Sequence, residues 1–153
     1  MLFASAGAGA WKFEDRTAGS GLETLPPTYQ AAWADVNRDG RLDLVTAGKL
    51  FINEREGSGH WLALRLRGDG ARVNRDAIGA QVRIALPDGR ILARQVEAGT
   101  GEGNANSPVL HFGLGSFAGP LKVEIRWPDG EKTAATIEGV DRVLEFAREF
   151  PAP

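Results

Sequence analysis

The chain of 153 residues contains no cysteine, which excludes disulfide bonds, thiol nucleophiles and thiolate metal sites. It also lacks any apolar run near the roughly 20 residues that a membrane-spanning helix needs, so membrane insertion is not expected. There is no excess of charge of either sign, because the net charge is −2 and basic and acidic residues are interspersed. This balance argues against a nucleic-acid partner. The chain is long enough to bury a core of its own.

One nine-residue stretch, 35–43, has the ligand spacing of a calcium loop. Oxygen-bearing side chains stand at its first, third, fifth and ninth positions, and glycine at the sixth position permits a sharp turn. Three carboxylates this close repel one another, and a divalent cation relieves that repulsion. The predicted calcium ligands are the side chains of Asp35, Asn37, Asp39 and Asp43 and the main-chain carbonyl of Arg41. The alternative for the same residues is a solvated Asp/Asn/Gly turn that binds no ion.

The segments on either side of this loop predict a β-hairpin, not the helices of an EF-hand. Residues 29–34 and 42–47 are short and rich in aromatic and branched side chains. The twelfth position, where an EF-hand needs a bidentate glutamate, is Thr46. Residues 49–53 predict a third strand. The calcium loop is therefore expected at the turn of a small antiparallel sheet.

The longer C-terminal part predicts several short strands with one apolar face each. Leu62, Leu64 and Leu66 alternate with other residues, as in a strand with a core side. Two later hairpins turn at Pro-Asp-Gly and repeat at an offset of 41 residues, which suggests equivalent positions in a stack of two sheets. Short strands between Pro/Gly turns predict an all-β fold, an antiparallel β-sandwich preceded by a blade-like hairpin with its calcium loop.

The predicted domain organisation has five parts. The N-terminal leader, residues 1–10, lacks the basic residues and the long apolar run of a signal peptide. It is expected to be disordered. The parts are the leader at 1–10, a repeat-like unit at 11–53, a polar link at 54–59, the sandwich at 60–148 and a tail at 149–153.

Four motifs follow one another from residue 60: His60-Trp61-Leu62, Asn74-Arg75-Asp76-Ala77-Ile78-Gly79-Ala80, His111-Phe112-Gly113-Leu114-Gly115 and Val123-Glu124-Ile125-Arg126-Trp127-Pro128-Asp129-Gly130. Together they resemble the ASPIC/UnbV family. The segment 11–53 is similar to one FG-GAP/VCBS repeat, the blade unit that precedes this domain in the family and carries a calcium loop of this type. Family members usually have several blades, and a lone blade leaves its lateral faces uncovered. The resemblance therefore implies a fragment of a longer protein, a blade packed on its own sandwich, or a homo-oligomer.

The resemblance implies a non-enzymatic, calcium-binding interaction or adhesion module, secreted or displayed at the cell surface, with a protein or glycan partner. One alternative is a carbohydrate-binding module. Another is an accessory protein or enzyme of bacterial natural-product biosynthesis, since some bacterial members occur beside such genes. A cleft that gathers His111, Asp76 and Glu102 would favour the enzyme, although no catalytic residue is predicted.

Four residues of the predicted sandwich are candidates for ligand binding. Trp61 falls out of step with the core leucines, so it is expected on the surface, where its ring could stack on a sugar. In the polar loop that follows, Arg75 could clamp a carboxylate, and Asn74 and Asp76 could bind a second ion or a sugar. The structural reading is that these Asx side chains tie off a turn by bonding neighbouring amides. Trp127 shares an apolar face with its neighbours and is expected in the core.

Overall fold

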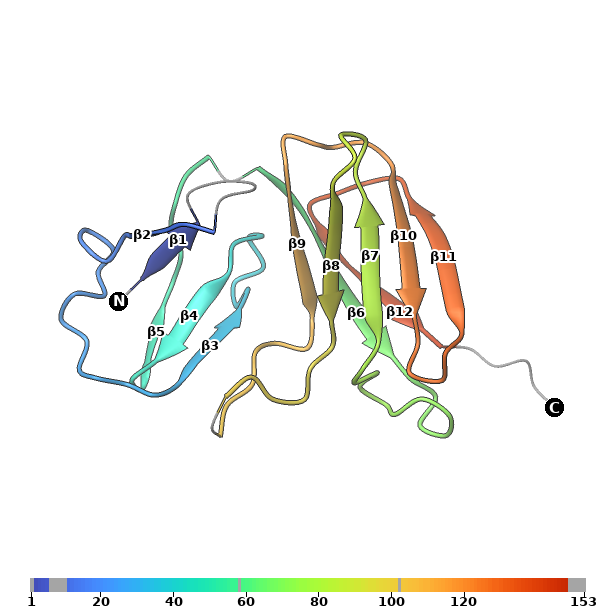
Figure 1. Ribbon diagram of the computed structural model, residues 1–153, viewed down its shortest axis with the longest axis horizontal. Coiled ribbons are helices and arrows are strands. Elements are labelled where there is room, and N and C mark those ends of the chain that lie inside the picture. Colours follow the sequence, from blue (N-terminus) through green and yellow to red (C-terminus); the bar gives the residue numbers. More distant parts are fainter. Residues whose placement is uncertain (1, 6–10, 58, 102, 149–153) are drawn as a thin grey trace.

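The computed structural model describes residues 2–5, 11–57, 59–101 and 103–148. The described residues form twelve β-strands and no helix, hence none that is long and apolar enough to cross a membrane. Figure 1 shows two bodies side by side, strands β1 to β5 on the N-terminal side and β6 to β12 on the C-terminal side. The all-β prediction is confirmed.

The N-terminal body contains a two-stranded hairpin and a three-stranded antiparallel sheet. The strands are β1 (Phe3–Ser5), paired with β2 (Phe13–Asp15), and β3 (Ala31–Ala34), β4 (Asp43–Thr46) and β5 (Lys49–Phe51), in the order β3-β4-β5. The predicted hairpin and third strand are confirmed. The leader prediction is wrong for residues 3–5, because Phe3 pairs with Asp15 in an antiparallel ladder. The rest of the predicted leader, residue 2 aside, lies outside the described residues, as does the predicted tail.

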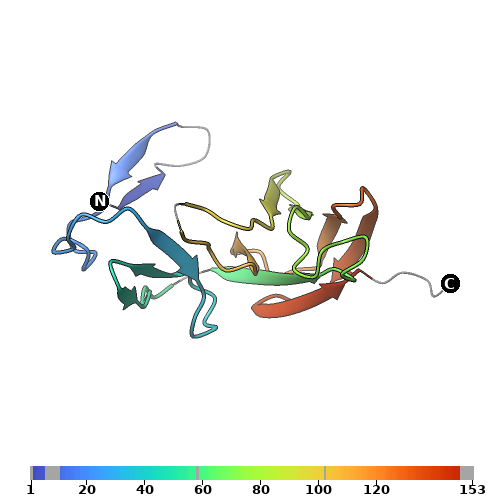
Figure 2. The ribbon, with the colours of Figure 1, turned by 90° about the horizontal axis from the view of Figure 1, so that it is seen from below.

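The β3-β4-β5 sheet has two unlike faces. Trp33, Leu44 and Phe51 lie opposite one another in register and form one face, on which Leu44 is buried. Val45 and Leu50 lie on the other face and are 44% and 49% exposed. Seen from below in Figure 2, this sheet and the β1-β2 hairpin lie at one end of the molecule, away from the sandwich core. The small sheet therefore leaves one apolar face uncovered.

The C-terminal body is a sandwich of two sheets. The three-stranded sheet has the order β12 (Arg142–Ala147), β6 (His60–Arg67), β9 (Leu110–Gly115), and the four-stranded sheet has the order β11 (Lys132–Ile137), β10 (Leu121–Arg126), β7 (Gln81–Ala85), β8 (Ile91–Gln95). All pairings are antiparallel except that of β12 with β6, which is parallel.

The two Pro-Asp-Gly hairpins do not occupy separate sheets as the repeat of 41 residues suggests. They lie side by side in one sheet, joined through β7 and β10, where Ile84 pairs with Val123 and Val82 with Ile125. The matching alternation gives both hairpins the same apolar face, and two such hairpins bury it best when their inner strands pair. The four-stranded sheet is thus a hairpin and its repeat placed edge to edge.

The core between the two sheets confirms the alternation read from the sequence. Leu62, Leu64 and Leu66 are buried, and so is Trp127. The indole N–H of Trp127 donates a hydrogen bond of 2.9 Å to Thr133, which satisfies the polar atom of an otherwise apolar side chain. The sandwich therefore holds its shape through a continuous apolar core.

Candidate metal site

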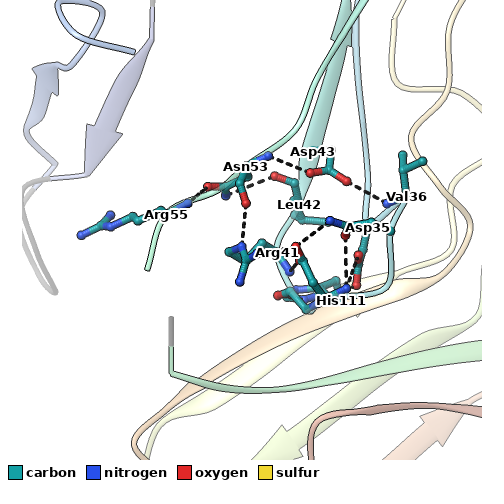
Figure 3. Close-up of polar contacts among 11 residues, drawn as sticks. Asp35, Val36, Arg41, Leu42, Asp43, Asn53, Arg55 and His111 are labelled. Atoms are coloured by element: carbon teal, nitrogen blue, oxygen red, sulfur yellow. Dashed lines mark hydrogen bonds and ion pairs between the residues drawn. The ribbon is translucent and has the colours of Figure 1, made fainter. Parts of the chain in front are cut away.

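The predicted calcium loop, 35–43, joins β3 to β4, and its first and last carboxylates, Asp35 and Asp43, accept hydrogen bonds from backbone amides (Figure 3). The carboxylate of Asp35 accepts the amides of Asp39 and Gly40 at 3.0 and 2.9 Å. The side-chain oxygen of Asn37 accepts the Asp39 amide at 3.2 Å. The first and third predicted ligands thus face the turn that they close.

Asp39, the fifth position of the loop, lies beside a positive charge from the loop itself. Its carboxylate accepts the Arg41 amide at 2.9 Å and the Asn37 side-chain amide at 2.7 Å, and it forms an ion pair with the Arg41 guanidinium. Burial raises the pKa of Asp39, but the hydrogen bonds from Arg41 and Asn37 and the Arg41 charge outweigh burial and hold that pKa below its ordinary value. The carboxylate is therefore ionised at neutral pH.

Asp43, the ninth position, ties the base of the loop to the end of β5. It is 1% exposed, and its two oxygens accept the amides of Val36 and Asn53, each at 2.9 Å. The carbonyl of Asn53 accepts a hydrogen bond of 2.6 Å from the Arg41 side chain (Figure 3). The sequence predicts Asn53 as the last residue of the third strand, 49–53, whereas β5 ends at Phe51 and Asn53 ties the base of the loop.

The donor set fits a hard cation in its chemistry, because carboxylate, amide and carbonyl oxygens are the ligands that calcium takes. Asp35, Asn37 and Asp39 turn their oxygens into the loop. Asp43 accepts the amides of Val36 and Asn53 at the base of the loop, and no three His, Cys, Asp or Glu side chains of the described residues come together as a metal cluster. The loop closes through its own hydrogen bonds, so a cation would compete with Arg41 for Asp39.

The tip of the loop rests on the sandwich. The carbonyl of Gly40 lies 2.8 Å from Nε2 of His111, so this ring nitrogen carries the hydrogen and donates. His111 in turn stacks on Trp61, with ring centroids 5.8 Å apart and planes 10° apart. Gly40 has a φ of +84°, and a Cβ there would lie 2.0 Å from the indole nitrogen of Trp61. Glycine alone meets both requirements, the backbone conformation and the close approach.

The prediction of Trp61 as an exposed stacking surface is wrong. Its side chain is 9% exposed, because the start of β6 is covered on its second face by the docked loop. Ala63, two residues on, is also buried, at 2%. Trp61 lies on the face of β6 opposite the core leucines, and a large aromatic side chain at such a position indicates a strand that is buried on both faces.

A second contact joins the edge of β3 to the long loop between β8 and β9, which reaches toward β3 in Figure 1. The amide of Trp33 donates to the side-chain oxygen of Asn106 and its carbonyl accepts the Ser107 amide, both at 2.9 Å. The side-chain amide of Asn104 donates to the Ala31 carbonyl at 2.5 Å. The β3-β4-β5 sheet is therefore held on the sandwich at two places, the loop tip and the β3 edge.

The other predicted ligand residues lie far from this contact. Asn74 closes its own loop, accepting the Ile78 amide at 2.8 Å and donating to the Ile78 carbonyl at 2.9 Å. This is the turn-closing role predicted as the alternative to ligand binding. Arg75 and Asp76 are exposed in the same loop. This loop follows the end of β6, whereas Trp61 stands at its start, and a strand of eight residues spans about 25 Å. The four candidates do not form one site.

The residues named for the enzyme alternative are not brought together either. His111 pairs with the first half of β6 and is bonded to Gly40, whereas Asp76 belongs to the loop beyond the far end of β6. Glu102 lies outside the described residues. Nothing in the described part of the chain therefore supports a catalytic role for His111.

Residues 70–149 match the family described as ASPIC and UnbV, and this range is more than half of the chain. The chain belongs to the ASPIC and UnbV family. The motifs at 74–80, 111–115 and 123–130 lie inside the matched range, and the motif at 60–62 lies before it. The family resemblance drawn from the sequence is confirmed for the sandwich.

The chain is also similar to cartilage acidic protein 1 of Mus musculus. The two are 28% identical over 143 residues, which cover 87% of this chain and 22% of the relative. The chain thus spans about a fifth of the length of that relative. Because 87% of the chain is more than the family match covers, the similarity extends into residues before position 70.

Proposed function

We propose that this chain is a non-enzymatic interaction module of a secreted or cell-surface protein, in which calcium holds one FG-GAP/VCBS-type repeat on an ASPIC/UnbV sandwich. The observation that carries the proposal is the docking of the loop tip, where Gly40 meets His111 and Trp61. An ion that stiffens this loop would also stiffen the contact between the two units.

The residues that would hold calcium are the five of the predicted set, Asp35, Asn37, Asp39 and Asp43 through their side chains and Arg41 through its carbonyl. The ion would supply the positive charge that three carboxylates within nine residues call for. Asp35 and Asn37 already face the loop, and Asp39 is ionised. Their part is to bind the ion and fix the turn that presents Gly40 to the sandwich.

Three observations support the repeat and its setting. The β3-β4-β5 sheet carries the loop at its first turn, as the repeat resemblance implies. The relative matched across most of the chain is named for cartilage, which accords with a secreted module whose partner is a protein or a glycan. The exposed face with Val45 and Leu50 gives a second unit, from the parent protein or from another copy, a surface on which to pack.

Calcium binding is tested by thermal unfolding in 1 mM calcium and in chelator, with calorimetric titration of the ion. At a calcium concentration of 100 times Kd, binding adds about 2.7 kcal/mol to the free energy of unfolding. The melting temperature should therefore rise by several degrees in calcium. Asp39→Ala should abolish this rise.

The matched control is Asp69→Ala. Asp69 is also a loop aspartate whose carboxylate accepts backbone amides, those of Ala71, Arg72 and Val73, but it lies in the sandwich. It should lower stability equally in calcium and in chelator. Identical melting curves of the wild-type protein in the two conditions would contradict the proposal, and so would loss of the calcium increment in Asp69→Ala.

A further inference from the structure

A cavity of about 390 Å³ lies where the repeat meets the sandwich, beside the docked loop. The repeat supplies Trp33 to its wall, β8 supplies Arg94 and Gln95, and the loop and strand that follow supply Glu97, Asn106 and His111. Its volume is within the range of about 300 to 1,000 Å³ of small-molecule sites. Neither unit forms this cavity alone.

The polar groups around the cavity have hydrogen-bonding capacity to spare. Asn106 uses its side-chain oxygen on the Trp33 amide, and its side-chain nitrogen has no partner among the described residues. Gln95 accepts a bond from Gln81, which leaves its own amide nitrogen to donate. Arg94 and Glu97 bring one charge of each sign, so the cavity does not select an ion of either sign. The lining suits a neutral ligand rich in hydroxyl groups, which both donate and accept.

An aromatic ring completes the set. Trp33 is 37% exposed and its side chain forms part of the wall. An indole face packs against the C–H face of a sugar ring, while amide and carboxylate side chains take up the hydroxyl groups around its edge. We propose that this cavity binds a neutral sugar residue, with Trp33 as the stacking surface and Gln95, Glu97 and Asn106 as hydrogen-bonding partners.

This inference rests on the proposed function in one respect, the dependence of the cavity on the docked repeat. Trp33 is positioned by its bonds to Asn106 and Ser107, and the repeat by the loop tip on His111. A calcium ion that secures the loop would therefore strengthen sugar binding. The sugar would strengthen calcium binding by the same factor, because coupling between two sites is reciprocal.

The test is titration of the whole chain, labelled with ¹⁵N, with methyl glycosides of glucose, galactose, mannose and N-acetylglucosamine, and with glucuronate as an acidic comparison. At least one neutral glycoside should shift the Trp33 indole and Asn106 side-chain amide signals in a saturable way. Trp33→Ala should weaken this binding at least tenfold. Trp11→Ala, at a position that is 99% exposed, is the matched control and should leave the affinity unchanged.

Gln95→Ala, on the exposed side of β8, covers the case in which Trp33→Ala does not fold, and should weaken binding at least threefold. The inference is overturned if no neutral glycoside shifts these signals, if only glucuronate does, or if Trp11→Ala loses as much affinity as Trp33→Ala. Repeating the titration in chelator separates the two proposals. Equal sugar binding with and without calcium would refute the calcium clamp and leave the sugar site, whereas a calcium-raised melting temperature without sugar binding would do the reverse.

Discussion

The sandwich and the N-terminal unit, strands β1 to β5, are held together by different forces, although both consist of β-strands. Between its two sheets the sandwich buries a continuous set of apolar side chains, from Leu62 on β6 to Ile125 on β10. In the N-terminal unit, Leu44 is the one buried apolar side chain among the described residues, beside two buried polar ones, Asp43 and Thr46. The sandwich is held by apolar burial, and the N-terminal unit by hydrogen bonds and by its contacts with the sandwich.

This contrast predicts which kind of substitution should destabilise each unit most. Apolar burial is non-directional and insensitive to ions, so the sandwich should respond mainly to loss of packed volume. The N-terminal unit depends on ionised oxygens and on a few oriented contacts with the sandwich, so it should respond to backbone strain and to charge. Truncations to alanine in the two units should therefore have unequal effects.

The largest effect is expected from truncating the sandwich core. Ile125 is 0% exposed, and Ile125→Ala should lower the free energy of unfolding by about 2 to 5 kcal/mol, through lost burial and the cavity left behind. Val45→Ala is the counterpart in the N-terminal unit, where the side chain is 44% exposed and the cost should be within about 0.5 kcal/mol. Denaturant unfolding measures both. Equal costs at the two positions would mean that the N-terminal unit has an apolar core of its own.

The next largest effect is expected at the loop tip. Gly40 and Gly48 both have a left-handed backbone, with φ of +84° and +72°, so alanine at either position costs about 1 to 2 kcal/mol. A Cβ at Gly48 meets nothing within 4 Å, whereas a Cβ at Gly40 overlaps Trp61. Gly40→Ala should cost about 1 to 3 kcal/mol more, the range for forcing extra atoms into a packed contact.

Amide hydrogen exchange shows which strands lose stability in Gly40→Ala but not in Gly48→Ala. Gly40→Ala should speed exchange in β3, β4 and β5 while β7 and β10 keep their protection, because the overlap prevents docking without touching the core. Gly48→Ala should leave the Trp61 indole signal unchanged. Similar stability and similar exchange rates in the two variants would mean that the loop tip does not pack against the sandwich.

The fold could be predicted from the sequence wherever the alternation within a single strand marks the side that faces the core. Leu62, Leu64 and Leu66 mark a core side by alternation, and that side is buried. The arrangement of the strands could not be read in this way. The strands that begin near Val82 and Val123 have the same alternation of apolar residues. That alternation shows which side of each strand faces the core, but not which strand pairs along its edge.

The candidate site divides along the same line. The oxygen spacing of the loop is a local pattern and is visible in the sequence. Its contacts are not local, because His111 lies 71 residues from Gly40, and Asn106 lies 73 residues from Trp33. Trp61 carried the available clue, since its position out of step with the core predicts a covered second face. The same position also fits an exposed side chain, because phase alone does not distinguish solvent from a second layer of protein.

The smallest expected effect concerns the side chains of His60, at the start of β6, and Asp141, just before β12. The carboxylate of Asp141 lies 2.7 Å from the His60 ring and accepts the Trp61 amide at 3.0 Å. The hydrogen bond with His60 is the largest cause of the lowered pKa of Asp141; burial opposes it, and the Trp61 amide and the His60 charge lower the pKa further. Because the folded-state pKa lies below the unfolded one, the stabilisation is full above about pH 4 and is lost as the pH falls through the folded-state pKa.

Asp141→Asn isolates this contribution, since asparagine keeps an oxygen for the Trp61 amide and tolerates the positive φ of 58° at this position. The pair is 41% and 45% exposed, so the cost at pH 5 should be less than about 1 kcal/mol. The difference between wild type and variant should shrink toward zero as the pH is lowered from 5 to about 2, as followed by denaturant unfolding. Asp76→Asn, on an exposed loop of the sandwich, is the control for a change of net charge alone. A difference that stays constant with pH would assign the effect of Asp141 to the shape of its side chain and not to its charge.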